Sequence, residues 1–288
     1  MGTAAAPGTL PAGPAGRRPL HESIAALPAT QRLAVRSDVP AEEPGWTTTA
    51  DLQAADALDA LLARVHGNVC ALVPAGTVGD VPDTVAPAYV LGWYLAAVAS
   101  AAAVPFVHAR RVPGLRADRV ALRLSDVGWP DAVAVLSPRF ACLPDDPDAG
   151  HRDAVPVADL EALRTALRAE LAEHATGFLA AWGRRGRRGR HALWGFVSDA
   201  LVDAVWEAAP GEVGAREAAA VLPPRGRGRL APFVGTGGFR SFARPDGTVE
   251  LVRSRVSCCL AYAVPGAEVC LSCPRIDDVE RARRVRTP

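Results

Sequence analysis

Lysine is absent from this 288-residue chain, so arginine supplies all 32 of its strongly basic side chains. Glycine and proline are abundant, with 26 and 25 residues, and a bias toward GC-rich codons is the simplest interpretation of this composition. The 31 acidic residues leave a formal net charge of only +1. That balance excludes a global electrostatic argument for binding nucleic acid or an anionic membrane surface, so only local basic patches remain as candidates.

The N-terminal segment lacks the charged, apolar and small-residue order of a secretory signal. We expect residues 1–20 to form a disordered tail. Residues 85–104 are uncharged and roughly as long as a membrane span, but they are rich in alanine and contain Pro87, Trp93 and Tyr94. This composition predicts a buried core helix and no stable membrane insertion. We therefore expect a cytoplasmic protein.

The spacing of apolar residues predicts an α+β fold in which helices predominate. Helices are expected at 51–65, 85–103, 157–182 and 191–209. Hairpins are expected over 117–145 and over 239–255, the second turning at 245–247 and leading directly into the cysteine motif described next. The order of segments predicts three parts: a tail at 1–20, a mixed domain at 21–225 and a C-terminal metal-binding region at 226–288.

Four of the six cysteines lie within sixteen residues near the C-terminus, in the stretch CCLAYAVPGAEVCLSC. They are Cys258, Cys259, Cys270 and Cys273. The other two, Cys70 and Cys142, are isolated in apolar contexts typical of small buried side chains. A chain in a compartment that keeps thiols reduced has no need of disulfides. Four thiolates in one short segment can instead hold a soft metal or an iron–sulfur centre.

Three chemistries remain open for these cysteines, and a 2Fe-2S cluster is favoured. Structural zinc takes its paired cysteines from turns with two to four intervening residues, which the vicinal pair Cys258–Cys259 does not provide. Thiol–disulfide exchange uses C-x-x-C, but such motifs open a helix next to a strand, and here Pro274 follows directly. The six histidines are scattered, so a second metal site is not expected.

The spacing C-C-x10-C-x2-C, with an arginine-rich strand before it and Tyr262 and a Pro-Gly pair inside it, resembles the FhuF-type ferric siderophore reductases. The resemblance implies that all four cysteines bind one 2Fe-2S cluster, and that the protein reduces ferric iron in hydroxamate siderophores in the cytoplasm. Residues 193–205 also resemble the LWGN-like helix of that family, with Phe196 in place of Asn. Ala261 stands where members often have a Tyr. The specific part covers about the last thirty residues.

The resemblance implies two partners, a ferric siderophore and an electron donor such as a ferredoxin. No flavin or nicotinamide fingerprint is visible, so electrons must come from another protein or a diffusible donor. Basic side chains around the motif could favour an anionic cluster and steer an acidic donor, or could be solvated strand residues. The candidates for docking substrate or donor are Arg240, Arg244, Arg253, Arg255, Tyr262 and Arg275.

Other patterns predict structure more than chemistry. The run RRGRRGR at 184–190 is interpreted as a solvated loop between helices, with a phosphate or anionic-partner contact as the alternative. The glycines at 235–238 predict a turn, and the tryptophans at 182, 194 and 206 predict core packing. Two other functions stay open: a scaffold with structural zinc, and a redox-sensing regulator, although no DNA-binding helix stands out. Siderophore synthetases contain a distantly similar domain and are a further possibility, but this chain is too short for their ATP-binding portion and those enzymes lack this cysteine set.

Overall fold

The computed structural model describes residues 18–27, 33–75, 77–209, 211–223 and 231–286. Helices make up about 49% of the structure and strands about 15%, which confirms a helix-rich α+β fold. Residues 1–17 of the predicted tail lie outside the described residues. The end of that predicted tail is wrong, because Pro19 begins helix α1 (Pro19–Ala25), in which the Leu20 side chain is fully buried.

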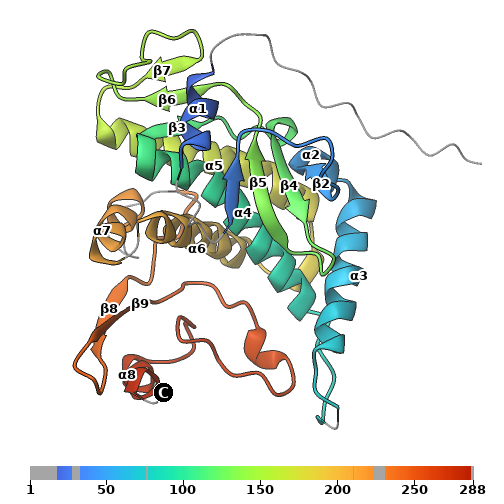
Figure 1. The fold of residues 1–288 in the computed structure, drawn as a ribbon. Coiled ribbons are helices and arrows are strands. Elements are labelled where there is room, and N and C mark those ends of the chain that lie inside the picture. Colours follow the sequence, from blue (N-terminus) through green and yellow to red (C-terminus); the bar gives the residue numbers. More distant parts are fainter. Residues whose placement is uncertain (1–17, 28–32, 76, 210, 224–230, 287–288) are drawn as a thin grey trace, which may run out of the picture.

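Helix α4 (Val85–Ala109) runs through the middle of the molecule (Figure 1). It is long and apolar enough to cross a membrane, yet 72% of its most apolar window is buried inside the protein. Helices α3 (Ala55–Ala71), α5 (Leu160–Trp182) and α6 (Arg190–Ala208) pack against it. The prediction of a buried core helix is therefore confirmed.

The predicted helices all form, with shifted ends. Helix α5 begins where the Asp159 carboxylate accepts a hydrogen bond from the Ala162 amide at 2.8 Å, a side-chain N-cap. Between α4 and α5, His174 Nδ1 donates to the Leu115 carbonyl at 2.6 Å and Nε2 accepts from the Tyr94 hydroxyl at 2.7 Å. Besides α1, three helices in the described part of the chain were not predicted: the short α2 (Thr49–Leu52), α7 (Gly211–Val221) and α8 (Asp278–Arg286).

Two small sheets cover one side of the helices (Figure 1). The first has the order β1-β5-β4-β2, from Ala34–Arg36, Pro130–Val135, Val120–Leu124 and Trp46–Thr48. The second has the order β3-β6-β7, from Arg111–Pro113, Phe140–Cys142 and Ala154–Pro156. The predicted 117–145 hairpin is confirmed for β4 and β5. Its second run divides, however, because β6 leaves that sheet to pair with β3.

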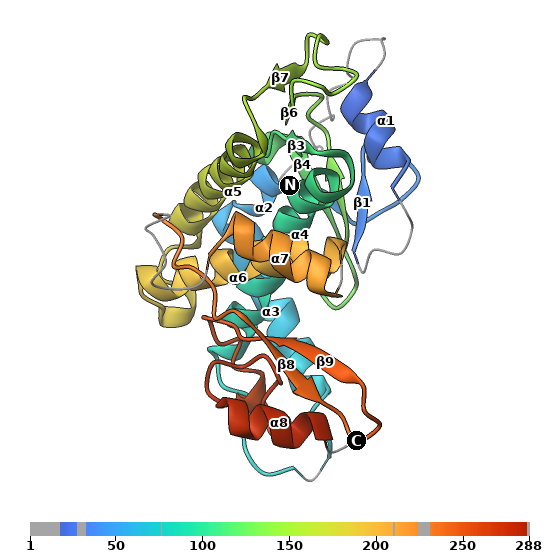
Figure 2. The same cartoon turned by 90° about the vertical axis from the view of Figure 1, so that its left-hand side faces the viewer.

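The predicted C-terminal hairpin is also confirmed. Strands β8 (Phe239–Ala243) and β9 (Val249–Arg253) pair antiparallel, with Phe239 opposite Arg253. Residues 254–277 connect β9 to α8 and carry the four cysteines; this segment is called the cysteine loop. The hairpin, the cysteine loop and α8 lie together at one end of the molecule, next to α6 and α3 (Figures 1 and 2). The division into parts at 21–225 and 226–288 stays a prediction.

Candidate metal centre

Helix α6 holds the backbone that leads into the first two cysteines. The Asp199 carboxylate accepts hydrogen bonds from the amides of Val256 at 3.0 Å and Ser257 at 2.8 Å, and also from the Ser257 hydroxyl. The same segment packs against α6 at Gly195, where a Cβ would lie in van der Waals contact with the Ser257 Cβ at 3.4 Å. The vicinal cysteine pair is therefore placed by a helix about sixty residues earlier in the chain.

Asp203, one helical turn after Asp199, extends this anchor to two arginines. Arg253 donates through Nε and Nη2 to Asp203, at 2.5 and 2.9 Å, and through Nη1 to Asp199 at 3.0 Å. Residues four apart share one helix face, so Arg253 spans both carboxylates. Only 1% of Arg253 is exposed, and a side chain so buried cannot contact a docked protein. The structure therefore assigns Arg253 an architectural role in place of the predicted docking role.

Arg255 also donates to Asp203, at 2.9 Å, and its side chain stays about one-third exposed. Burial lowers the pKa of Arg255, but the negative charges of Asp203 and Asp199 outweigh that effect and raise it above the ordinary value. The thiolate charge of Cys259 acts in the same direction. Arg255 is therefore a fixed cation beside the cysteines.

Helix α8 holds the C-x-x-C half of the motif. Arg281, which is 4% exposed, donates to the carbonyls of Cys273 at 2.7 Å and Leu271 at 3.2 Å. Arg284 donates to the Val269 carbonyl. The Arg255 amide donates to the Ser272 carbonyl at 2.9 Å, which ties this half to the segment before Cys258. Both halves of the motif are thus fixed by backbone hydrogen bonds.

The four cysteine thiols are close enough to affect one another's pKa. Cys259 interacts with Cys270, and Cys273 interacts with both Cys270 and Cys258. The interaction between Cys259 and Cys270 lowers the pKa of the Cys270 thiol and raises that of Cys259. Burial is the main cause that raises the pKa of Cys273. The first half of the motif therefore meets the second, with Cys270 the most acidic thiol of the coupled set.

The donor set fits a 2Fe-2S cluster. A 2Fe-2S cluster is held by four cysteine thiolates, and the four thiols here interact with one another within one short segment. Within the described ranges, no three His, Cys, Asp or Glu side chains converge as they would around one metal ion. The vicinal pair Cys258–Cys259 fits the single tetrahedral ion of a structural zinc site poorly. Cys258, Cys259, Cys270 and Cys273 would hold the cluster.

Aromatic side chains line the side of the site that faces α4. Burial raises the pKa of Tyr89, and the thiolate charges of Cys259 and Cys270 raise it further, so Tyr89 lies within electrostatic range of these two thiols. Its ring centroid lies 5.2 Å from that of Trp93, which in turn lies 6.2 Å from the half-exposed Trp129. A row of rings therefore leads from Tyr89 to the surface at Trp129.

The remaining predicted docking residues fall into two groups. Tyr262 and Arg275 lie at the motif, where the exposed Arg275 guanidinium sits 4.7 Å from the Tyr262 ring centroid. Arg240 pairs with Asp278 of α8 at 3.3 Å, and Arg244 pairs with Glu250 at the turn of the hairpin. The turn lies four residues from the Phe239–Arg253 pair, or about 13 Å along the strands. The structure therefore brings Tyr262 and Arg275 to the motif and leaves Arg244 remote from it.

Sequence reasoning missed the residues that hold the motif. Asp199 and Asp203 carried a readable signal, two acids four positions apart in an otherwise apolar helical run. Arg281 and Tyr89 carried none, because their roles depend on how α8 and α4 pack against the loop. The positioning residues of this site are thus mostly remote from it in sequence.

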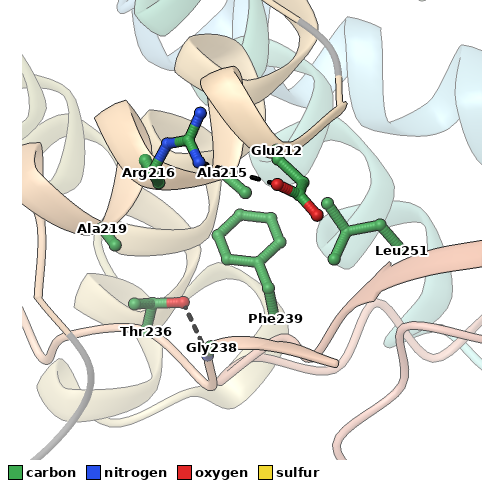
Figure 3. Close-up of a pocket in the computed structure, with 8 residues that line it drawn as sticks. All are labelled: Glu212, Ala215, Arg216, Ala219, Thr236, Gly238, Phe239 and Leu251. Carbon is green, nitrogen blue, oxygen red and sulfur yellow. Dashed lines mark hydrogen bonds and ion pairs between the residues drawn. The ribbon is translucent and has the colours of Figure 1, made fainter. Parts of the chain in front are cut away.

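A separate pocket of about 310 Å³ lies between α7 and the β8–β9 hairpin. Figure 3 shows the Phe239 ring at its centre, with Ala215 and Leu251 beside it and the Glu212–Arg216 ion pair at its edge. No cysteine lines this pocket. It is therefore distinct from the thiol site.

No curated protein matches the chain. A family model does match, over residues 255–275, and that stretch contains Cys258, Cys259, Cys270 and Cys273. This segment is a match to the FhuF 2Fe-2S C-terminal domain, a family that implies a 2Fe-2S cluster as cofactor.

Proposed function

We propose that this protein is a cytoplasmic reductase of ferric hydroxamate siderophores that receives single electrons from a ferredoxin-type donor. The observation that carries the proposal is the proximity of four cysteine thiols inside the segment that matches the FhuF 2Fe-2S C-terminal domain. That family supports a siderophore-iron reductase. A site of four free thiolates also requires a compartment that keeps thiols reduced.

The substrate in this proposal is Fe(III) held by hard oxygen ligands. A 2Fe-2S cluster bound by the four cysteines would supply the single electron. The product is Fe(II), whose softer and less charged ion is held more weakly by the same oxygen ligands. The iron is therefore released by reduction, and the siderophore itself need not be broken.

The described residues around the site have two tasks. Asp199 and Arg281 fix the backbone of the two cysteine halves, so that the ligands are preorganised. The exposed cation Arg275, stacked over Tyr262 at the same loop, is available to an acidic partner. Such a charge steers an approaching donor more than it strengthens the complex.

The test begins with protein purified without oxygen. Visible absorption and EPR spectra are recorded before and after dithionite, and a ferric hydroxamate is then added with a ferrous trap. A Cys270→Ala variant removes one proposed ligand, and Cys70→Ala is the matched control because Cys70 is exposed and outside the motif. The gallium(III) form of the siderophore controls for binding, since gallium(III) does not accept the electron.

The proposal expects a red-brown protein with a spin-half signal on reduction. The ferric chelate should reoxidise it while Fe(II) appears in the trap, and the gallium chelate should not. Cys270→Ala should lose the signal and Cys70→Ala should keep it. A colourless zinc protein would contradict the cofactor. A reduced protein that ignores the ferric chelate would contradict the reductase and favour a redox sensor.

A further inference from the structure

The arginine-rich run at 184–190 connects α5 to α6 and is mostly exposed, as its composition predicts, but Arg185 and Arg188 are partly buried and make specific contacts. The Arg185 carbonyl accepts a hydrogen bond from Trp182 Nε1 at 2.9 Å, and the Arg185 side chain pairs with Asp59 of α3 at 2.8 Å. Gly186 and Arg187 then take left-handed backbone conformations, with φ of 74° and 52°. This turn folds the chain back before α6 begins.

The turn brings Arg188 to the first two cysteines. Its Nη2 donates to the Cys258 carbonyl at 2.8 Å, and its guanidinium carbon lies 4.9 Å from the Phe196 ring centroid. The thiolates of Cys258 and Cys259 are close enough to act on its charge. Phe196 is the residue that stands in place of Asn in the LWGN-like run, and here it forms the platform under Arg188.

Arg188 differs from the other cation beside the cysteines. Arg255 forms a salt bridge with Asp203, at 2.9 Å. Among the residues that the structure describes, no carboxylate forms a salt bridge with Arg188. The Arg188 guanidinium donates its hydrogen bond to a carbonyl and packs against an aromatic ring. Its positive charge therefore acts on the thiol site without a neutralising carboxylate.

A fixed charge at this place acts on electron transfer. A centre held by four thiolates becomes more negative when it gains an electron, so a nearby cation stabilises the reduced form more than the oxidised form. Partial burial protects this interaction from screening by salt. We propose that Arg188 is a positioning residue for the cluster, which fixes the Cys258 backbone and raises the reduction potential through its unneutralised charge.

This inference rests on the cofactor part of the proposed function. It is tested by EPR-monitored redox titration of the holoprotein and of Arg188→Gln, Arg188→Lys and Arg187→Gln. Arg187 belongs to the same run and is exposed, so Arg187→Gln is the matched control. At the wild-type midpoint, we expect the oxidised-to-reduced ratio of Arg188→Gln to rise about tenfold, a shift of ~59 mV for one electron. Arg188→Lys and Arg187→Gln should stay near the wild-type midpoint.

Several outcomes would overturn the proposal. They are a fully loaded Arg188→Gln protein with the wild-type midpoint, or a tenfold shift in Arg188→Lys despite its retained charge. If Arg188→Gln does not keep its cluster, the Arg188→Lys variant decides the test. An Arg188→Lys protein that holds its cluster and has the wild-type midpoint supports the proposal, and loss of the cluster from both variants opposes it. The titration needs no siderophore. A negative result here therefore leaves chelate reduction untouched, and failed chelate reduction leaves this result standing.

Discussion

The Asp199 carboxylate accepts both the backbone amide and the hydroxyl of Ser257, the residue directly before Cys258. It is also a salt-bridge partner of the buried Arg253. A single side chain therefore joins the helical core to the cysteine loop. Stability and cluster binding should be coupled at this point.

Replacing Asp199 tests that coupling. Asp199→Ala leaves a buried arginine with only Asp203 as its carboxylate partner and strips two backbone amides of their acceptor. We expect a loss of about 3–5 kcal/mol in the free energy of unfolding, together with a lower iron content after purification. Urea unfolding followed by circular dichroism measures the first quantity. Arg244→Gln, which breaks an exposed ion pair at the hairpin turn, should cost less than about 1 kcal/mol. Equal losses in the two variants would contradict the anchor.

Arg281 is expected to matter more for the cluster than for the fold. Its guanidinium holds the carbonyls of Cys273 and Leu271 from α8, so Arg281→Gln should loosen the C-x-x-C half of the ligand set. We expect faster loss of visible absorbance when the holoprotein is exposed to an iron chelator. Arg286→Gln changes an exposed arginine of the same helix and should lose absorbance at the wild-type rate. Similar rates in both variants would refute the role of Arg281.

The amino-acid sequence predicts those features that local pattern determines. The spacing of apolar residues is sufficient to predict α4, α5 and α6, and the Pro245–Gly247 turn is sufficient to predict the C-terminal hairpin. Helix α8 was missed because six of the nine residues in its sequence, DVERARRVR, are charged, and its buried contact comes from one arginine. Strand β1 was missed because its three residues are ordered by pairing with β5, with Ala34 opposite Ala132.

The candidate site also combines residues that local sequence pattern predicts with residues that only tertiary contacts bring together. The four cysteines are close in sequence, and so their common role could be predicted from spacing. Arg188 and Asp199 reach the loop from 70 and 58 residues away, distances over which one sequence carries no pairing signal. Burial reversed the prediction for Arg253, because a strand residue expected to face solvent instead faces two carboxylates of α6.

Gly237 is predicted to accept no side chain. A Cβ built there would clash with the Ser254 carbonyl oxygen, so Gly237→Ala must move the backbone that leads from β9 to the cysteines. We expect a loss of about 1–3 kcal/mol, measured by urea unfolding. Gly67, in the interior of α3, has no neighbour within 4 Å of the same position, and Gly67→Ala should stabilise by up to about 1 kcal/mol. If Gly237→Ala is as stable as the wild-type protein, the close approach is wrong.

Acid should destabilise the fold through buried histidine. Burial lowers the pKa of His174 below its ordinary value of 6.5, and burial likewise lowers that of His21. The unfolded chain therefore binds these protons more readily than the folded one. Their contribution to stability is complete above the unfolded pKa of 6.5 and is lost as the pH falls through the lower folded value.

The His174 share of this effect can be isolated by comparing slopes. Melting temperatures of wild-type protein and His174→Gln are measured between about pH 7.5 and about pH 5.5. The variant loses hydrogen bonds to Tyr94 and Leu115, so it should melt lower throughout, but its decline toward acid should be shallower. Acid lability of a cluster affects both proteins alike and cancels in the difference. Parallel declines would show that His174 does not titrate as proposed.

Donor docking should depend on Arg275 and not on Arg244. Both arginines are exposed, but Arg275 lies on the cysteine loop over Tyr262, whereas Arg244 lies at the far turn of the hairpin. Reversing a charge next to the site of electron transfer weakens the steering of an acidic donor, and that effect declines with distance and with salt. We expect Arg275→Glu to slow reduction by a ferredoxin about tenfold at low ionic strength.

The matched variant Arg244→Glu reverses a charge that is remote from the cysteines, so it is the control for Arg275→Glu. Stopped-flow traces of cluster reduction, taken at low and high salt, should show the two variants converging as salt rises, because screening removes the steering term and leaves the chemistry of transfer unchanged. If Arg275→Glu remains slow at high salt, the charge acts on the cluster and not on docking. If both variants slow equally at low salt, the donor binds to the hairpin as a whole, and the docking surface extends over β8 and β9.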